Sequence, residues 1–319
     1  MKFLLLGAWR SNTGPSNVNH ALISNSDSSM RYLKWKRLGR IERWIKCIIS
    51  NPIVVSGGIT SFELRLIKLF HKKIIHIVHG YLKVENEVNH LNLPAEFIKN
   101  EAESLRLSRI ILPVSEKYSI WLKEQLPEYF HKISFLNNGI SINRRKSVPK
   151  IPMSIAVSGG NRGVKNNKIV CEAVAKLISD GYNCTFHVFG RLYDGGEDLP
   201  DFPFIDIKGH LNHDEYYNQL DSISLLVVNS ELESFGLVVA DALNCNCSLL
   251  LSQNVGSTSI FQLQDCDIVY NNHDVIELSH KILHLLLHPN ADRIFQSVDI
   301  DAVSEKRMFL NLKEIAHEV

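Results

Sequence analysis

The 319-residue chain lacks the features that would define a membrane protein, a secreted protein or a metal-binding domain directly. No apolar run approaches the roughly 20 residues that are needed to cross a bilayer. The apolar start, Met1–Ala8, is broken by Lys2 and has no cleavage site of a signal peptide, so we expect a first β-strand there. The cysteines have the spacing of neither a zinc ribbon nor a CxxC redox pair, which favours reduced, mostly buried thiols in a cytosolic protein. They are Cys47, Cys171, Cys184, Cys245, Cys247 and Cys266.

The chain also lacks a substantial net charge, since its formal charge is +1. That sum conceals two halves of opposite sign. Residues 1–150 carry 24 Lys and Arg against 11 Asp and Glu, a balance of +13, whereas residues 151–319 carry 11 against 23, a balance of −12. Such an asymmetry is typical of a protein in which one half meets an anionic surface. The 45% of hydrophobic and 22% of charged residues exclude disorder, collagen and coiled coil as the main architecture.

Short apolar runs alternate with amphipathic stretches along the whole chain, and continuous apolar runs between helices are typical of buried parallel strands. A basic, proline-containing stretch, residues 141–149, divides this alternation in two. We therefore predict an α/β protein of two doubly wound, Rossmann-like domains facing a cleft, with ligands at the carboxyl ends of the strands. The predicted strands are 3–6, 53–55, 74–78, 110–113, 133–136, 153–157, 184–189, 204–207, 224–228, 248–251 and 268–270.

The loop after the predicted strand 153–157 combines adjacent glycines with two cations and precedes a predicted helix. These residues are Gly159, Gly160, Arg162 and Lys165. Glycines let a backbone approach a ligand closely, and free N–H groups at a helix start attract anions, so the loop predicts a phosphate cradle. It matches neither GxxxxGK[ST] nor GxGxxG, and a tight turn with solvated basic residues is the alternative. Gly14 and Gly256 occupy similar places after other predicted strands.

The most specific segment is Asn229–Leu243, which follows another predicted strand. Glu233 lies in its loop, Gly236 opens an expected helix, and Asp241 comes eight positions after Glu233. A carboxylate can accept two hydrogen bonds from the vicinal hydroxyls of a sugar or ribose. The alternative is that Glu231 and Glu233 are charges that cap a helix.

This segment resembles a motif of the retaining GT-B glycosyltransferases known as family 4, or group 1, which is written roughly S-x-x-E-G-F-G-L-x-x-x-E-A. The chain has the serine, the first glutamate, Phe-Gly-Leu and the final alanine, but Ser234 replaces a glycine and Asp241 replaces the second glutamate. Weaker similarities lie at 113–115, 137–140, 188–190 and 207–210. The loop Gly159–Lys165 takes the place of a G-R-x4-K loop, with Gly160 where arginine is usual and Arg162 as a nearby cation.

The resemblance implies a role for each matching residue. Glu233 would contact hydroxyls of the donor sugar, Asp241 the nucleotide ribose, and Arg162 and Lys165 the diphosphate, whose leaving charge they would stabilise. No metal is expected, and the DxD spellings at Asp265 and Asp299 are interpreted as chance. The remaining donor-binding residues implied are Gly14, Gly159, Gly160, Gly190, Ser234, Phe235, Gly236 and Leu237.

The basic half is predicted to bind the acceptor. His79 follows the predicted strand 74–78, where it could bind the donor sugar or help with the acceptor proton; the alternative is a structural histidine, as expected for His76. Residues 31–49 hold seven Lys and Arg and one acid, with Trp35 and Trp44, and indicate an amphipathic helix on an anionic membrane. The alternative is a helix packed on the sheet. No nucleic-acid motif is present, so nucleic acid is not an expected partner.

The sequence thus predicts an acceptor domain over 1–148, a nucleotide-sugar domain over 149–300 and a C-terminal helix, 301–319, that crosses back to the first domain. The expected reaction moves a hexose from a nucleotide diphosphate sugar to a hydroxyl of a glycan or lipid-linked acceptor, with retention, in surface polysaccharide or lipopolysaccharide synthesis. The protein is expected in the cytoplasm, peripheral to the inner face of the membrane. A non-catalytic nucleotide-sugar-binding subunit and a GT-B epimerase are the alternatives.

Overall fold

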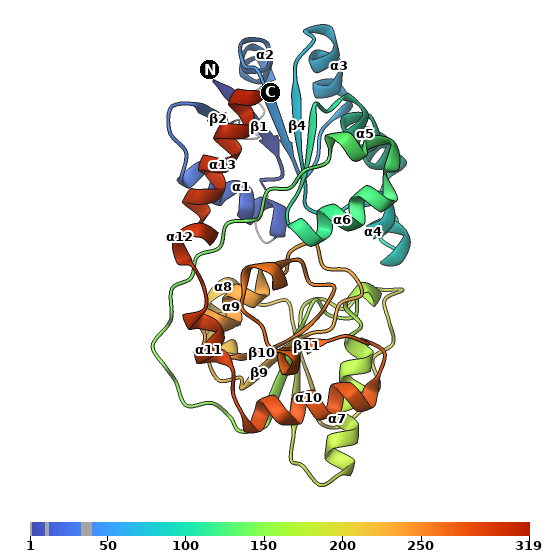
Figure 1. The fold of residues 1–319 in the computed structure, drawn as a ribbon. Coiled ribbons are helices and arrows are strands. Elements are labelled where there is room, and N and C mark those ends of the chain that lie inside the picture. Colours follow the sequence, from blue (N-terminus) through green and yellow to red (C-terminus); the bar gives the residue numbers. More distant parts are fainter. Residues whose placement is uncertain (1, 10–12, 33–39) are drawn as a thin grey trace. The chain divides into compact units, whose positions relative to one another are not determined.

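A computed structural model describes residues 2–9, 13–32 and 40–319 (Figure 1). Contacts divide the chain into an N-terminal unit, Met1–Glu87, Leu91–Ile140 and Ile300–Val319, and a C-terminal unit, Val88–His90 and Ser141–Asp299. The expected linker 141–149 thus falls within the C-terminal unit. The last helices, α12 (Ile300–Val303) and α13 (Glu305–Glu318), fall within the N-terminal unit.

The N-terminal unit contains a five-stranded parallel sheet in the order β2-β1-β3-β4-β5. The order reverses between β1 and β3, which makes that position the switch point of a doubly wound sheet. The strands are β1 (Phe3–Gly7), β2 (Met30–Tyr32), β3 (Ile53–Ser56), β4 (Ile74–Val78) and β5 (Ile110–Pro113). The helices between them are α1 (Gly14–Ser24), α2 (Arg40–Ile49), α3 (Ser61–Leu69), α4 (Leu82–Val88), α5 (Ala95–Leu107) and α6 (Glu116–Gln125).

The predicted strand 133–136 is wrong, and β2 was not predicted. The segment does run beside β5, since Ser134 and Leu136 donate backbone hydrogen bonds to the carbonyls of Ile111 and Pro113 at 3.0 and 2.9 Å. A parallel ladder would return a hydrogen bond from residue 113, but proline has no N–H. The pairing is therefore reduced to one isolated bridge, between Ile111 and Ile133.

The C-terminal unit contains a six-stranded parallel sheet in the order β11-β10-β9-β6-β7-β8. Counted from the other edge, this is the 3-2-1-4-5-6 order of Rossmann folds, with the switch point between β6 and β9. The strands are β6 (Ser154–Ser158), β7 (Thr185–Phe189), β8 (Ile205–Gly209), β9 (Leu225–Val228), β10 (Ser248–Ser252) and β11 (Ile268–Val269). The helices are α7 (Asn167–Ser179), α8 (His213–Leu220), α9 (Val238–Asn244), α10 (Val275–Leu287) and α11 (Ala291–Gln296).

Helices α7 and α10 pack against each other beside this sheet (Figure 1). Their apolar residues close the core over fully buried strand residues such as Ile155, Val157 and Leu225. The two doubly wound, Rossmann-like units confirm the predicted fold class. The topology also places the loops that follow β6 and β9 on either side of one switch point.

Candidate functional site

The loops after β6 and β9 are joined by hydrogen bonds at the switch point of the C-terminal unit. Glu231 N–H donates to the carbonyl of Val164 at 2.9 Å. The buried side chains of Asn166 and Asn229 both donate to the carbonyl of Asn272, at 2.6 and 2.8 Å. These bonds hold the expected phosphate loop and the expected sugar-binding loop side by side.

The glycines of the β6 loop pack against the loop after β7. Gly160 has φ +63°, and a Cβ there would lie 1.8 Å from the carbonyl oxygen of Arg191. Gly190 has φ +114°, and its Cβ would lie 2.7 Å from the nitrogen of Gly160. The N–H groups of Gly159 and Gly160 both donate to the carbonyl of Phe189, at 2.8 and 2.9 Å. Close backbone packing therefore accounts for these glycines, and their N–H groups are already used.

The two predicted cations of this loop lie over one glycine. A Cβ on Gly159 would meet the side chain of Lys165 at 2.8 Å and the guanidinium of Arg162 at 3.1 Å. Lys165 also forms an ion pair with Glu233, and both side chains are largely buried, with 12% and 14% exposed. Three of the four predicted catalytic residues, Arg162, Lys165 and Glu233, are thus brought together.

Two further cations near this loop were missed from the sequence. Lys168 is in the first turn of α7, and Arg191 follows Gly190, whose backbone touches the glycine loop. Neither forms an ion pair with a carboxylate among the residues that the structure describes, and the same holds for Arg162. The signal available in the sequence was the position of Arg191 two residues after the predicted strand 184–189, and of Lys168 at the helix start that follows the glycine loop.

The segment from Glu233 to Leu237 is fixed by the loop after β10. Glu233 pairs with Val255, and its carbonyl accepts from Gly256 N–H at 2.9 Å. Phe235 is buried and accepts from Ser257 N–H at 2.8 Å. Gly236 has φ +89° and precedes α9 rather than opening it, which corrects the expected helix start. Ser234 lies half-buried between these anchored residues, and Leu237 takes the N-cap position of α9.

Asp241 belongs to a second cluster of polar contacts, which is separate from the Lys165–Glu233 pair. The hydroxyl of Tyr217 on α8 donates to Asp241 Oδ1 at 2.5 Å. Burial raises the pKa of Asp241, while the Tyr217 hydrogen bond and the charge of His213 oppose this shift. The Tyr217 ring lies under the guanidinium of Arg145 at 5.2 Å, and that guanidinium pairs with Asp221. Tyr217 was not predicted as a site residue.

His79 lies at the carboxyl end of β4, in the N-terminal unit. Its Nε2 is 2.8 Å from Oγ of Ser56, the last residue of β3. Burial, followed by the charge of His76, lowers the pKa of His79 to about 3. Gly14 is the first residue of α1, and a Cβ there would meet nothing within 4 Å, so local packing does not require glycine.

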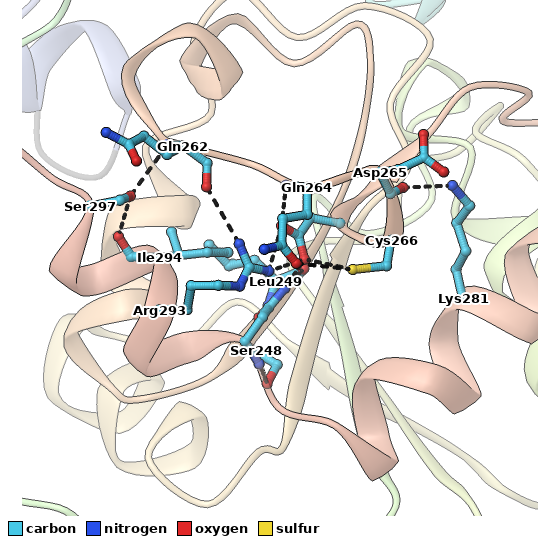
Figure 2. Close-up of polar contacts among 12 residues, drawn as sticks. Ser248, Leu249, Gln262, Gln264, Asp265, Cys266, Lys281, Arg293, Ile294 and Ser297 are labelled. Atoms are coloured by element: carbon cyan, nitrogen blue, oxygen red, sulfur yellow. Dashed lines mark hydrogen bonds and ion pairs between the residues drawn. The ribbon is translucent and has the colours of Figure 1, made fainter.

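The aspartates of the DxD sequence Asp265–Asp267 belong to a structural network at the edge of the sheet (Figure 2). Asp267 is fully buried and accepts two hydrogen bonds from Arg293, both at 2.7 Å, and one from Asn290 at 2.7 Å. Lys281 donates to the carbonyl of Asp265 at 2.9 Å. These bonds fasten the β11 edge to α10 and α11. In the described part of the chain, no group of three or more His, Cys, Asp and Glu side chains is placed to hold a metal ion.

The predicted amphipathic helix over 31–49 is only partly described, because residues 33–39, including Trp35, lie outside the described residues. The remainder is β2 up to Tyr32 and then α2. Cys47 faces the core, whereas an apolar face of α2 is exposed, with Ile41 at 74%. Trp44 stacks on Phe62 of α3 at 5.2 Å. The exposed apolar side chains of both helices, called here the α2–α3 surface, are Ile41, Trp44, Ile45, Ile48, Ile49, Phe62 and Leu69.

The two units together have the fold of GT-B glycosyltransferases. The chain aligns over 100% of both chains with HepE of Anabaena in complex with UDP and glucose, at a TM-score of 0.72 and 11% identity. It aligns over 97% of its length and 99% of WaaG, a glycosyltransferase involved in lipopolysaccharide biosynthesis, at a TM-score of 0.66 and 12% identity. A sucrose-phosphate synthase from Thermosynechococcus elongatus aligns at 0.67 and 12% identity, over 100% and 99%.

Residues 142–297 match the family model described as Glycosyl transferases group 1. The match covers nearly all of the C-terminal unit and includes the motif around Glu233. No curated protein matches the chain. None of the helices built from the described residues is long and apolar enough to span a membrane.

Proposed function

We propose that the protein transfers a hexose from a nucleoside diphosphate sugar to an acceptor hydroxyl, with retention at the anomeric carbon. The single observation that carries this proposal is the Lys165–Glu233 pair, set at the switch point of a group 1 glycosyl transferase domain. The pair places a cation that can bind phosphate in contact with a carboxylate that can accept hydrogen bonds from hydroxyls. A nucleoside diphosphate sugar carries both kinds of group. The complexes of HepE with UDP and with UDP-glucose support the donor class.

In this proposal, Arg162 and Lys165 hold the diphosphate and stabilise the charge that grows on it as the glycosidic bond breaks. Glu233 accepts hydrogen bonds from the hexose hydroxyls, and Asp241 accepts them from the ribose. The basic side chains supply the charge that a metal ion would otherwise provide, so the reaction runs without one. Gly14, with its open surroundings at the start of α1, lets the first loop approach the donor.

We further propose a lipid-linked or surface-glycan acceptor, as in polysaccharide or lipopolysaccharide synthesis, and a cytoplasmic protein that docks on the inner face of a membrane. The α2–α3 surface supports docking because its side chains can enter the interface while nearby lysines meet anionic headgroups. Lys72 donates to the carbonyl of Ile48 and so lies beside this surface, while Lys46 on α2 pairs with Glu42. The involvement of WaaG in lipopolysaccharide biosynthesis supports the acceptor class.

Thermal unfolding with UDP-, GDP-, ADP- and dTDP-sugars tests donor binding, because a ligand that binds only the folded protein raises the midpoint, and more so the further its concentration exceeds its Kd. We expect one base to protect the protein, and transfer to be lost in Glu233→Ala. Protection without transfer would indicate a binding subunit, and conversion of the donor without an acceptor would indicate an epimerase. No protection by any of the four would overturn the proposal.

Vesicle flotation tests the docking surface. Wild type should float with vesicles that contain anionic lipid and should not float with neutral vesicles. Ile45→Glu should abolish flotation, because it places a charge in the apolar face. Ile120→Glu is the matched control, since Ile120 is exposed to a similar degree, 57% against 52%, on α6. Equal flotation of the two variants would contradict the membrane proposal.

A further inference from the structure

A buried polar chain crosses the carboxyl ends of β1, β3 and β4 in the N-terminal unit. It links Asn19 on α1, Ser56 at the end of β3 and His79 after β4. Asn19 and Ser56 are fully buried, and His79 is half-buried. Buried polar groups are costly unless they are paired, so each donor and acceptor in this chain can be accounted for.

The orientation of the Asn19 amide is fixed by its donors. Its Nδ2 donates to the carbonyls of Ala8 and Ser56, at 2.9 and 3.2 Å. A flipped amide would direct its oxygen at both carbonyl oxygens, which are acceptors only. Oδ1 of Asn19 therefore faces the hydroxyl of Ser56.

This orientation determines which partner receives the hydroxyl proton of Ser56. The 2.6 Å contact between Ser56 Oγ and Asn19 Oδ1 requires the hydroxyl to donate, because an amide oxygen can only accept. A serine hydroxyl has one proton, and here Asn19 takes it. The 2.8 Å contact between Ser56 Oγ and His79 Nε2 must then be donated by the imidazole. In a neutral ring, Nδ1 is consequently the acceptor.

We propose that Asn19 and Ser56 are positioning residues that hold His79 in the Nε2–H tautomer, with Nδ1 presented as the acceptor for a ligand hydroxyl. Nδ1 has no hydrogen-bond partner among the residues that the structure describes. Burial and the neighbouring His76 favour the neutral ring, as the lowered pKa of His79 indicates. The ligand part of this inference rests on the proposed function, since a donor or acceptor sugar supplies the hydroxyl. His79 can then orient such a hydroxyl, but its Nδ1 cannot donate to it.

The tautomer can be measured without any substrate. In ¹⁵N-histidine-labelled protein, long-range ¹H–¹⁵N spectra distinguish a protonated from an unprotonated ring nitrogen, and His79→Gln identifies the His79 signals by their loss. We expect a protonated Nε2 and an unprotonated Nδ1 in wild type at neutral pH. The opposite pattern, or a protonated ring, would overturn the inference without bearing on transferase activity.

Two variants test the positioning role. In Asn19→Ala the Ser56 hydroxyl proton is released and can donate to Nε2, so His79 should shift to the Nδ1–H tautomer. In Ser56→Ala the acceptor is removed, so the two tautomers should mix. The buried His76, on β4, provides the internal control for folding, and its signals should not move. A purely structural role would leave the His79 tautomer unchanged in whichever variant folds, and that result would also overturn the inference.

Transfer assays separate this inference from the proposed function. Ser56→Ala should lower kcat/KM by roughly 2- to 10-fold, the size of one net hydrogen bond. If wild type transfers no sugar, the proposed function fails while the tautomer result stands. If transfer is normal and Ser56→Ala changes neither kcat/KM nor the spectrum, only the positioning inference fails.

Discussion

Lys165 and Glu233 form an ion pair that joins the loop after β6 to the loop after β9. Both side chains are largely buried, so each would carry a high desolvation cost without the other. Each of the two charges is thus compensated by the other. A ligand with both a phosphate and hydroxyls would replace this ion pair, because the phosphate would pair with Lys165 and the hydroxyls would donate to Glu233.

The two halves of this pair should respond differently to substitution. Lys165→Met removes the cation that we propose binds the diphosphate, so binding of UDP, or of whichever diphosphate protects the protein, should weaken about 10-fold or more. Glu233→Gln releases Lys165 from its carboxylate, so the same diphosphate should bind as well or a few-fold more tightly while sugar transfer falls. Isothermal titration calorimetry measures the binding.

The control for this pair is Lys176→Met. Lys176 pairs with Asp180 on the exposed side of α7, away from the loop, and its removal should leave diphosphate affinity unchanged. Weakening of equal size in Lys165→Met and Glu233→Gln would show that the pair acts only as a structural unit.

Gly160 and Gly14 should differ sharply when replaced by alanine. At Gly160 the new Cβ would clash with Arg191 O, and φ is positive, so Gly160→Ala should lower the free energy of unfolding by roughly 2–4 kcal/mol. At Gly14 the space is open and the site is helical, so stability should be equal or slightly higher. Urea unfolding measures both. Loss of transfer in a stable Gly14→Ala would support its approach to the donor, and normal transfer would argue against it.

The sequence predicted most of the fold because its signals are local. The strands over 74–78 and 110–113 have the predicted bounds, since a short continuous apolar run is visible within the segment itself. The loops with Lys165 and Glu233 could be placed together because carboxyl ends of adjacent parallel strands share one edge. The strand predicted over 133–136 is wrong for a different reason. The apolar run of this segment does not show that its neighbour, β5, ends in Pro113, which has no N–H to complete the ladder.

The contacts that the sequence did not reveal join residues far apart in the chain. Asn19 and Ser56 are separated by 37 positions, Ser56 and His79 by 23, and Tyr217 and Asp241 by 24. Each pair forms only because the strand order is fixed, and no spacing rule within a segment encodes it. The same holds for the glycine loop, where the partner of Gly160 is the backbone of Arg191.

Tyr217 should control how Asp241 binds a ligand. Tyr217→Phe removes a hydrogen bond that lowers the pKa of Asp241, so burial will raise that pKa further. A protonated carboxyl is a poorer acceptor for a ribose diol. Affinity for the diphosphate nucleotide should therefore fall in Tyr217→Phe, and it should fall more steeply than in wild type as the pH is lowered from 8 to 5.

Tyr216→Phe is the matched control for Tyr217→Phe. The hydroxyl of Tyr216 is buried and has no hydrogen-bond partner among the described residues, so its removal should leave affinity unchanged and stability equal or higher. Parallel pH profiles for wild type and Tyr217→Phe would contradict a role for Asp241 in ribose binding. A 2′,3′-dideoxy nucleotide should be insensitive to Tyr217→Phe.

Glu101 should make stability fall as the pH rises. One of its oxygens accepts from Leu82 N–H at 3.2 Å, the other is buried without a partner in the described structure, and burial raises its pKa to about 8. The folded state therefore keeps a proton that the unfolded chain loses near the usual value of 4.5. The stabilisation is complete below pH 4.5 and is lost as the pH rises through 8, by up to about 1.4 kcal/mol per unit.

Urea unfolding between pH 7 and 8 separates this effect from the histidines, and also from the buried cysteines, whose raised thiol pKa values make stability fall only near the usual value of 9.0 and above. His76 and His79 have pKa values lowered to about 4 and 3, so they reduce stability only as the pH falls below the 6.5 of the unfolded chain. Glu101→Gln should remove the decline with rising pH. Glu103→Gln should shift stability by a constant amount instead, because Arg106 and Lys68 hold the pKa of Glu103 near 2. Equal slopes in wild type and Glu101→Gln would show that Glu101 is already ionised in the folded protein at pH 7.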